Sequence, residues 1–291
     1  MDELNSPIQS LLVNIVNRQE ALERNVAVLI DHVQQIPRFF SPVHADQLLK
    51  LQVMLKPAFP VGARFVRIGG ENDGGYVMVN HRLNDTNVYN FGIGQEVTWD
   101  QTMANRGNTI YQFDHTIEQP PLVVGTTVFR RAGLGSTTTE MFVSLWDALT
   151  ANGDQDRNDL ILNIDIEGGE WDILPALLVR DLAPFSQIVI ELHDLLRFVT
   201  LSDFQAKVVA SLSSLFRTHQ IVHLHANNWG ARGIAGNVMG YDVLELTLLR
   251  KSDWMFETYR RTLPLDLDRP NAPFREEFAL GDWAMVEEIS G

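Results

Sequence analysis

The segment L-I-L-N-I-D-I-E-G-G-E-W-D-I-L-P-A-L, residues 160–177, begins as an apolar strand and then becomes acidic. Its first residues are mostly aliphatic, but Asp165, Glu167 and Glu170 follow directly after them. Carboxylates are rarely buried without a partner, so a core strand does not ordinarily end in a group of them. We therefore expect Asp165 and Glu167 to project from the end of a core strand into a binding crevice.

Strands and helices alternate on both sides of this segment. The predicted strands cover 86–94, 108–116, 121–129, 159–168 and 186–194, and the predicted helices cover 99–107, 140–153, 170–179 and 204–216. Such alternation predicts an α/β fold with a mostly parallel sheet that is covered on both faces. A strand pair over 64–80 precedes this region, and two strands over 219–230 and 241–250 close it with an antiparallel edge.

Composition excludes several classes of protein. The formal net charge of −14 disfavours nucleic acid and anionic membranes as main partners. The absence of cysteine excludes disulfides, thiolate zinc sites and cysteine nucleophiles. The amino terminus lacks the basic and apolar parts of a signal peptide, and no apolar run is long enough to span a bilayer. These features predict a cytoplasmic protein without a membrane span.

A heptad pattern sets the first 40 residues apart from the rest. Its a positions are Leu12, Gln19, Val26 and Val33, and its d positions are Ile8, Ile15, Leu22, Leu29 and Ile36. The pattern predicts a coiled coil that joins copies of the chain into a dimer or trimer. A lone amphipathic helix that packs on the main domain is the alternative. The predicted division is a coiled-coil helix and linker over 1–40, an α/β domain over 41–255 and a carboxyl-terminal extension over 256–291.

Polar side chains follow three of the predicted strands. Asp114 follows one strand, Asp165 follows another, and Glu191, His193 and Asp194 follow a third. Ligands of open α/β sheets bind outside the carboxyl ends of the strands. These residues are therefore expected to meet at one ligand-binding edge of the sheet.

The glycine turn after residue 90 indicates the kind of ligand. Gly92 and Gly94 allow a ligand to approach the backbone, and Asp114, twenty residues beyond Gly94, can accept hydrogen bonds from a ribose. A dinucleotide fingerprint would place a third glycine at Val97, and the charge of Glu96 would repel a pyrophosphate. A nucleoside with a positive charge suits this acidic loop better, and S-adenosylmethionine is such a molecule.

Several short motifs resemble those of a known enzyme family. The motifs are F-G-I-G at 91–94, F-D at 113–114, N-I-D-I-E-G-G-E-W-D-I-L at 163–174 and I-V-I-E-L-H at 188–193. Together they resemble the FkbM-type class I methyltransferases, and N-D-G-G-Y-V at 72–77 and H-L-H-A-N-N at 223–228 are similar to a branch that includes the methyltransferase-like 24 proteins. The resemblance covers about residues 64–250 and implies a Rossmann-like, mostly parallel seven-stranded sheet that binds S-adenosylmethionine.

The resemblance also implies roles for individual residues. Gly92, Gly94 and Glu96 would lie near the methionine, Asp114 would bind the ribose, and Asp165 would lie beneath the sulfonium methyl group. The segment 133–138, with Ser136, would approach the adenine. The mouth of the cofactor site would be formed by Asp73, Gly74 and Gly75.

For the acceptor we expect a sugar hydroxyl of a glycan or glycoconjugate. His193 is the candidate base that takes the hydroxyl proton, because a neutral imidazole is available near pH 7. Asp165 would orient His193 or act as the base itself. The expected acceptor contacts are His225, Asn228 and Trp229, since amides, imidazoles and an indole suit a polyhydroxylated ring.

Three alternatives stay open at this point. Asp165, Glu191, His193 and Asp194 offer ligands to an Mg²⁺ or Mn²⁺ ion. A nicotinamide-dependent oxidoreductase could use the same type of sheet, although Val97 argues against it. A non-catalytic coiled-coil scaffold with a degenerate cofactor domain is the third alternative.

Overall fold

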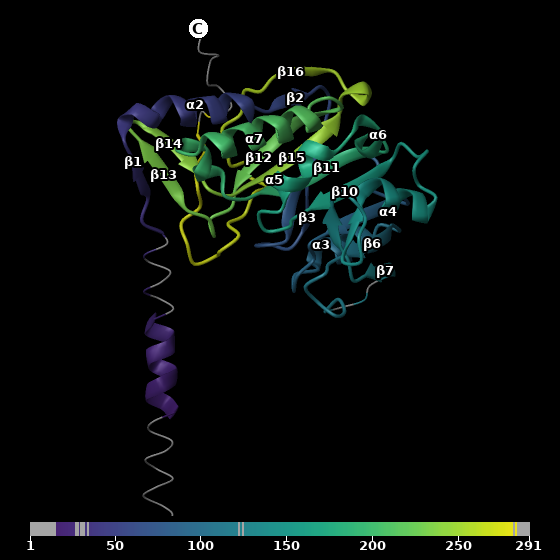
Figure 1. The fold of residues 1–291 in the computed structure, drawn as a ribbon, viewed down its shortest axis with the longest axis horizontal. Coiled ribbons are helices and arrows are strands. Elements are labelled where there is room, and N and C mark those ends of the chain that lie inside the picture. The colour runs from purple at the N-terminus through teal and green to yellow at the C-terminus, as the bar shows by residue number, and fades with distance from the viewer. Residues whose placement is uncertain are drawn as a thin grey trace, which may run out of the picture.

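The computed structural model describes residues 16–26, 29, 33, 35–121, 123, 125–281 and 283. Among these residues, seven strands form one sheet in the order β12-β15-β11-β10-β5-β6-β7 (Figure 1). The strands are β5 (Asn87–Phe91), β6 (Thr109–Phe113), β7 (Thr126–Arg130), β10 (Leu160–Ile164), β11 (Phe185–Leu192), β12 (His219–Ala226) and β15 (Leu244–Arg250). The pairs from β7 to β11 are parallel, and β15 is antiparallel to both β11 and β12. The predicted mixed α/β fold with a large, mostly parallel seven-stranded sheet is confirmed.

Helices and a hairpin bury both faces of this sheet. Leu162 and Ile164 of β10 belong to one apolar cluster and Ile161 belongs to another, because alternate side chains of a strand point to opposite faces. Helices α4, α5 and α7 contribute to the first cluster, and α3 and the hairpin β3–β4 contribute to the second. The elements are β3 (Phe65–Gly69), β4 (Gly75–Val79), α3 (Thr98–Ala104), α4 (Leu145–Asn152), α5 (Glu170–Ile173), α6 (Val179–Leu182) and α7 (Ser202–Leu215).

The hairpin β3–β4 is fixed to the sheet by polar contacts. The side chain of Gln187 in β11 donates to the carbonyl of Val79 (2.9 Å) and accepts from its amide (3.1 Å). Thr247 of β15 donates its hydroxyl to the carbonyl of Val77 (2.6 Å). These bonds place the turn of the hairpin, with Asp73, beside the carboxyl ends of the parallel strands.

Some element boundaries differ from those expected. The helix expected over 140–153 begins only at Leu145, because residues 142–144 form a strand, β9 (Phe142–Ser144), that pairs with β8 (Gly133–Gly135). The strand expected over 121–129 is β7, which begins at Thr126. The segment between β12 and β15 forms an additional hairpin, β13 (Arg232–Ala235) and β14 (Val238–Tyr241), and β1 (Arg38–Phe40) pairs with β13.

The carboxyl-terminal extension, described as far as residue 283, packs into the domain. β16 (Phe256–Thr258) pairs with β2 (Ala58–Pro60), which follows helix α2 (Ala45–Met54). Tyr259, Leu263 and Trp283 are buried in the main apolar cluster. The extension is therefore part of the same core. The remaining 3-10 turns are η1 (Pro42–His44), η2 (Leu174–Ala176), η3 (Leu195–Val199) and η4 (Lys251–Asp253).

The amino-terminal heptad lies only partly within the described residues. Residues 16–26 are helical, and Leu22 and Val26 are 63% and 46% exposed. Ile8, Leu12 and Ile15 lie outside the described residues, so the coiled coil stays a prediction. In the part of the chain that the structure describes, no helix is both long and apolar enough to cross a membrane.

Candidate functional site

A cavity of about 510 Å³ opens at the carboxyl ends of β5, β6 and β10. This volume is typical of sites for small molecules and cofactors. Of the residues expected to bind a cofactor, the cavity is lined by Asp73, Gly92, Gly94, Glu96, Asp114 and Asp165. The cavity thus lies at the edge of the sheet where the sequence predicts a binding crevice.

Gly92 brings the ends of β5 and β10 into close contact. Its φ angle is +86°, and a Cβ atom there would lie 1.5 Å from the carbonyl oxygen of Asp165. The amide of Gly92 donates to the carbonyl of Phe113 (2.9 Å), and the amide of Asp165 donates to the carbonyl of Phe91 (2.9 Å). The close approach therefore requires glycine and fixes Asp165 at the floor of the cavity.

Asp114 is held in place and kept ionised by three hydrogen bonds. Its Oδ1 accepts from the amide (2.7 Å) and the hydroxyl (2.6 Å) of Thr116, and its Oδ2 accepts from the amide of Gly94 (3.0 Å). Burial opposes ionisation, but these bonds hold the pKa of Asp114 below its usual range. Because a carboxylate has about four acceptor sites, Asp114 can still accept a bond from a ligand in the cavity.

The other glycines serve the packing of the cavity wall. A Cβ atom at Gly74, whose φ angle is +71°, would lie 2.2 Å from Cγ of Glu96, so the hairpin turn packs directly on the glycine loop. A Cβ atom at Gly75 would lie 2.1 Å from the carbonyl oxygen of Gly70. Both glycines lie outside the cavity lining, which Asp73 reaches instead. We therefore correct their expected role from ligand contact to close packing of the turn.

The wall near β6 and β8 is largely apolar and suits a flat ring. Phe113, Leu134 and Phe142 line it together with Ile173. Ser136 is exposed and lies outside the lining, because the strand β8 ends before it and turns away. Of the segment 133–138, which was expected to approach the adenine, Gly133 and Leu134 line the cavity and Ser136 does not.

His193 lies at the centre of four carboxylates beside the cavity. Its Nδ1 lies 3.1 Å from Oε1 of Glu170, a side chain that is completely buried. Its Nε2 faces Oε2 of Glu167 (3.5 Å), Oε1 of Glu191 (3.6 Å) and Oδ1 of Asp165 (3.8 Å). Asp165 is therefore on the Nε2 side of the ring, and Glu170, not Asp165, orients the imidazole.

The charges of this cluster shift the ionisation of its members. Burial raises the pKa of Asp165 to about 7, and the neighbouring carboxylates add to this rise while His193 opposes it. Burial also raises the pKa of Glu191. For His193 burial acts in the other direction, but the hydrogen bond to Glu170 and the surrounding carboxylates outweigh it and raise the pKa. A neutral imidazole near pH 7, which the sequence led us to expect, is thus disfavoured in this setting.

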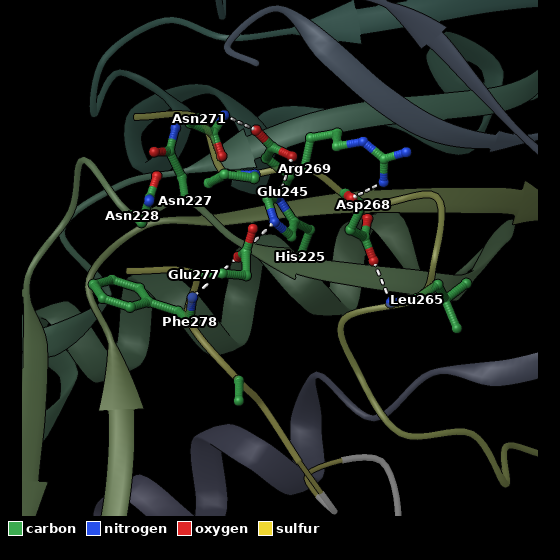
Figure 2. Close-up of polar contacts among 12 residues, drawn as sticks. His225, Asn227, Asn228, Glu245, Leu265, Asp268, Arg269, Asn271, Glu277 and Phe278 are labelled. Atoms are coloured by element: carbon green, nitrogen blue, oxygen red, sulfur yellow. Dashed lines mark hydrogen bonds and ion pairs between the residues drawn. The ribbon is translucent and has the colours of Figure 1, made fainter. Parts of the chain in front are cut away.

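Two of the three expected acceptor contacts are covered by the carboxyl-terminal extension. Figure 2 shows His225 between Glu245 and Glu277, with Nδ1 2.9 Å from the first carboxylate and Nε2 3.1 Å from the second. Asn228 is fully buried and bonds to the backbone of Ala272, to which it donates (3.0 Å) and from which it accepts (2.7 Å). Both residues are therefore structural, which corrects their expected role in acceptor binding.

Trp229 is the expected acceptor contact that remains accessible. It is 45% exposed, and its ring lies 5.3 Å from that of Phe274 in an edge-on arrangement. The guanidinium of Arg275 lies 4.6 Å from the centre of the Trp229 ring. Strand β12 is parallel to β11, so Trp229 follows it at the same edge of the sheet as the cavity.

Several residues beside the cavity were not identified from the sequence. Glu170 bonds to His193, and Asn227 donates to the expected Glu191 (2.7 Å). Asn271 of the extension donates to Asp73 (3.1 Å) and to Glu245 (2.5 Å). The acidic spacing in 165–170 could have indicated Glu170, but no local pattern could have indicated contacts with the extension.

The cluster around His193 also contains donors for a metal ion. One ligand atom from each of Asp165, Glu167 and His193 lies within 4.8 Å of the others. Asp194, an expected ligand, instead accepts from Arg197 (3.0 Å) and is about half exposed. Its left-handed backbone turns it away from the cluster, with a φ angle of 60°.

Comparisons with known proteins give only distant similarities. No family model and no curated protein matches the sequence. Among solved structures, the chain resembles fibrillarin in its complex with Nop5p, at 11% identity over 58% of this chain and 74% of that one, with a TM-score of 0.33. It also resembles a TehB-like SAM-dependent methyltransferase from Corynebacterium glutamicum, at 12% identity over 58% and 82% of the two chains, with a TM-score of 0.32. A hemolysin-like protein from Streptococcus thermophilus has 14% identity over 71% and 66%, with a TM-score of 0.36. No conclusion about function follows from similarities at this level.

Proposed function

We propose that this chain is an S-adenosylmethionine-dependent methyltransferase that methylates a hydroxyl oxygen of a sugar. The observation that carries the proposal is Asp114, held ionised at the end of β6 in the same cavity as Gly92 and Asp165. An acid at this position can bind a ribose, and glycines at the end of the preceding strand allow close approach to the backbone.

The charge of the cavity supports this cofactor over a dinucleotide. The carboxylates in its lining are Asp73, Glu96, Asp114, Asp165 and Glu167. None of the lining residues is a lysine or arginine, although both are common partners of phosphates. A pyrophosphate would be repelled there, whereas a sulfonium and an ammonium group would be attracted. The apolar wall at Phe113 and Leu134 suits the adenine.

The transfer of a methyl group requires chiefly positioning and the removal of one proton. The sulfonium and the acceptor oxygen must be held in line, which contributes much of the acceleration. Asp165 lies at the floor of the cavity, and its Oδ1 faces Nε2 of His193 at 3.8 Å. We assign the acceptor hydroxyl to the space beside these two side chains, and its proton to this pair.

The sugar acceptor and self-association are the further parts of this proposal. The exposed ring of Trp229 offers an apolar surface for the face of a sugar, and it lies at the same edge as the cavity. The exposed apolar side chains of Leu22 and Val26 support pairing of the amino-terminal helix with a second copy. An oligomer of this kind could act on neighbouring residues of one polysaccharide chain.

Calorimetric titration of the full chain tests the cofactor. We expect S-adenosylmethionine to bind and NAD to leave the heat signal unchanged. Binding of NAD alone would support the oxidoreductase alternative, and binding of neither would support the scaffold alternative. The matched control is Asp172→Asn, which removes an exposed carboxylate whose partner is Lys207, outside the cavity lining, and should leave the affinity unchanged.

A further inference from the structure

Three carboxylate oxygens surround Nε2 of His193 at distances that suit a shared ion better than hydrogen bonds. They belong to Glu167 (3.5 Å), Glu191 (3.6 Å) and Asp165 (3.8 Å). A hydrogen bond between a charged nitrogen and a carboxylate is about 2.7–2.9 Å long. Two ligands that each lie about 2.1 Å from one octahedral ion are about 3–4.2 Å apart. All three distances fall within that second range, but among the described residues only Asp165 and Glu167 also have oxygens within 4.8 Å of each other as well as of His193.

The imidazole is also oriented as metal-binding histidines are. Its Nδ1 faces the buried carboxylate of Glu170 at 3.1 Å, and the indole of Trp171 donates to the carbonyl of His193 (2.8 Å). Histidine ligands commonly hold their second nitrogen against a carboxylate, which fixes the tautomer and directs the lone pair of the other nitrogen. Glu170 thus directs Nε2 of His193 towards the three oxygens.

Two further features indicate that a ligand is needed between these side chains. Oδ1 of Asp165 is buried and has no hydrogen-bond partner among the described residues, which is costly for a carboxylate. Glu167 is a non-glycine residue with a φ angle of 55°, a strained conformation that brings its carboxylate to the His193 ring. Strain of this kind is concentrated at ligand sites.

From these contacts we propose that His193, Asp165 and Glu167 bind one divalent cation of the Mg²⁺ or Mn²⁺ type. Two carboxylate oxygens and one imidazole nitrogen suit such an ion. Glu191, whose Oε1 accepts from Asn227 (2.7 Å), adds negative charge beside it. The role of the ion rests on the methyl transfer proposed above. It would attract the acceptor hydroxyl oxygen, His193 would serve as a ligand, and the second oxygen of Asp165 would accept the proton.

Titration of the full chain with Mn²⁺, followed by the electron paramagnetic resonance signal of the free ion, tests the site. We expect one saturable site per chain. Glu167→Gln should weaken binding at least about tenfold, and because this side chain is 85% exposed the variant should fold. Asp165→Asn should have a similar effect. Glu170→Gln should weaken binding about 10- to 100-fold, as the loss of a carboxylate that orients a histidine ligand does.

Asp194→Asn is the matched control, because Asp194 follows His193 but bonds to Arg197 outside the cluster. It should bind Mn²⁺ as the wild type does. No saturable binding, or equal affinity in all variants, would overturn the site. The calorimetric titration with S-adenosylmethionine separates this result from the proposed function. Mn²⁺ binding without cofactor binding would contradict the methyltransferase proposal alone, and cofactor binding without Mn²⁺ binding would contradict the ion site alone.

Discussion

The edge of the sheet that contains the cavity has two acidic halves, which use their carboxylates differently. At the ends of β5 and β6, Asp114 is bonded by backbone amides and a hydroxyl and still lines an open cavity. Where β12 ends and β15 begins, Glu245 is buried beneath the extension and bonded to His225 and Asn271. The first half, which we call the open half, keeps acceptor capacity for a ligand. The second, which we call the sealed half, satisfies its charges within the protein.

The largest effect is expected where the two halves meet, at His193. His193→Ala should reduce turnover by about 10²- to 10⁴-fold, because the hydroxyl proton then lacks its positioned partners. The affinity for S-adenosylmethionine should be retained, since His193 lies outside the cavity lining. Transfer of a labelled methyl group to a glycan acceptor measures the first quantity, and calorimetry measures the second. Turnover near that of the wild type would remove His193 from the site.

The sealed half should respond through stability and not through ligand binding. His225→Gln leaves Glu245 and Glu277 facing each other without the positive charge between them, and should cost about 3–5 kcal/mol of unfolding free energy. Denaturant unfolding of the variant measures this cost. A loss below about 1 kcal/mol would mean that the buried ion pairs do little to hold the extension in place.

The buried group of His225, Glu245 and Glu277 also predicts a dependence of stability on pH. Burial disfavours the charged form of His225, but Glu245 and Glu277 outweigh it and raise the pKa to about 10. The unfolded chain has a histidine pKa of about 6.5, so the stabilisation is complete below that pH and is lost as the pH rises towards 10. Denaturant unfolding between pH 6 and 10 should show a decline that the His225→Gln variant lacks.

His219, on the same strand, provides the contrast. Its burial lowers the pKa to about 4, so its contribution is lost as the pH falls from about 6.5 towards 4. A wild-type stability profile that is flat above pH 7 would contradict the charged state of His225 and leave the account of His219 intact.

Two glycines of the open half should differ in their tolerance of substitution. Gly92→Ala places a methyl group against the backbone of Asp165 and should cost about 2–5 kcal/mol, from overpacking and a positive φ angle together. Gly94, whose φ angle is +49°, faces open space. Gly94→Ala should therefore cost only about 1–2 kcal/mol of unfolding free energy. Thermal or denaturant unfolding compares them. Equal losses would mean that the close approach of β5 and β10 is not what requires Gly92.

The sequence predicted the open half well and the sealed half poorly. Strand periodicity and the position of acids after strands located the sheet, Asp114, Asp165 and His193, because these features are local. The contacts of His225 and Asn228 depend on residues 44–52 positions further along the chain, which approach them only in the folded domain. Local patterns carry no signal for such contacts, so two polar residues at a strand end were interpreted as acceptor contacts.

The glycines show the same limit within the open half. Gly92 and Gly94 both line the cavity, but glycine at position 92 is also required by the nearby backbone of Asp165. Gly74 lies outside the lining and packs against the side chain of Glu96. A glycine in a sequence indicates close approach or a positive φ angle, but not which atom approaches. Only the packing of β10 and of the hairpin turn distinguishes these cases.

The central claim is that Asp114 binds the ribose of S-adenosylmethionine, and a double-mutant cycle between protein and ligand tests it most directly. The cycle compares the wild type and Asp114→Ala, each titrated with S-adenosylmethionine and with an analogue that lacks both ribose hydroxyls. Either change alone should weaken binding by about 1.5–3 kcal/mol, the cost of losing a hydrogen bond to a charged group. Both changes together should cost little more than one, because they remove the same bonds. Fully additive losses, or an unchanged affinity of folded Asp114→Ala, would contradict the account.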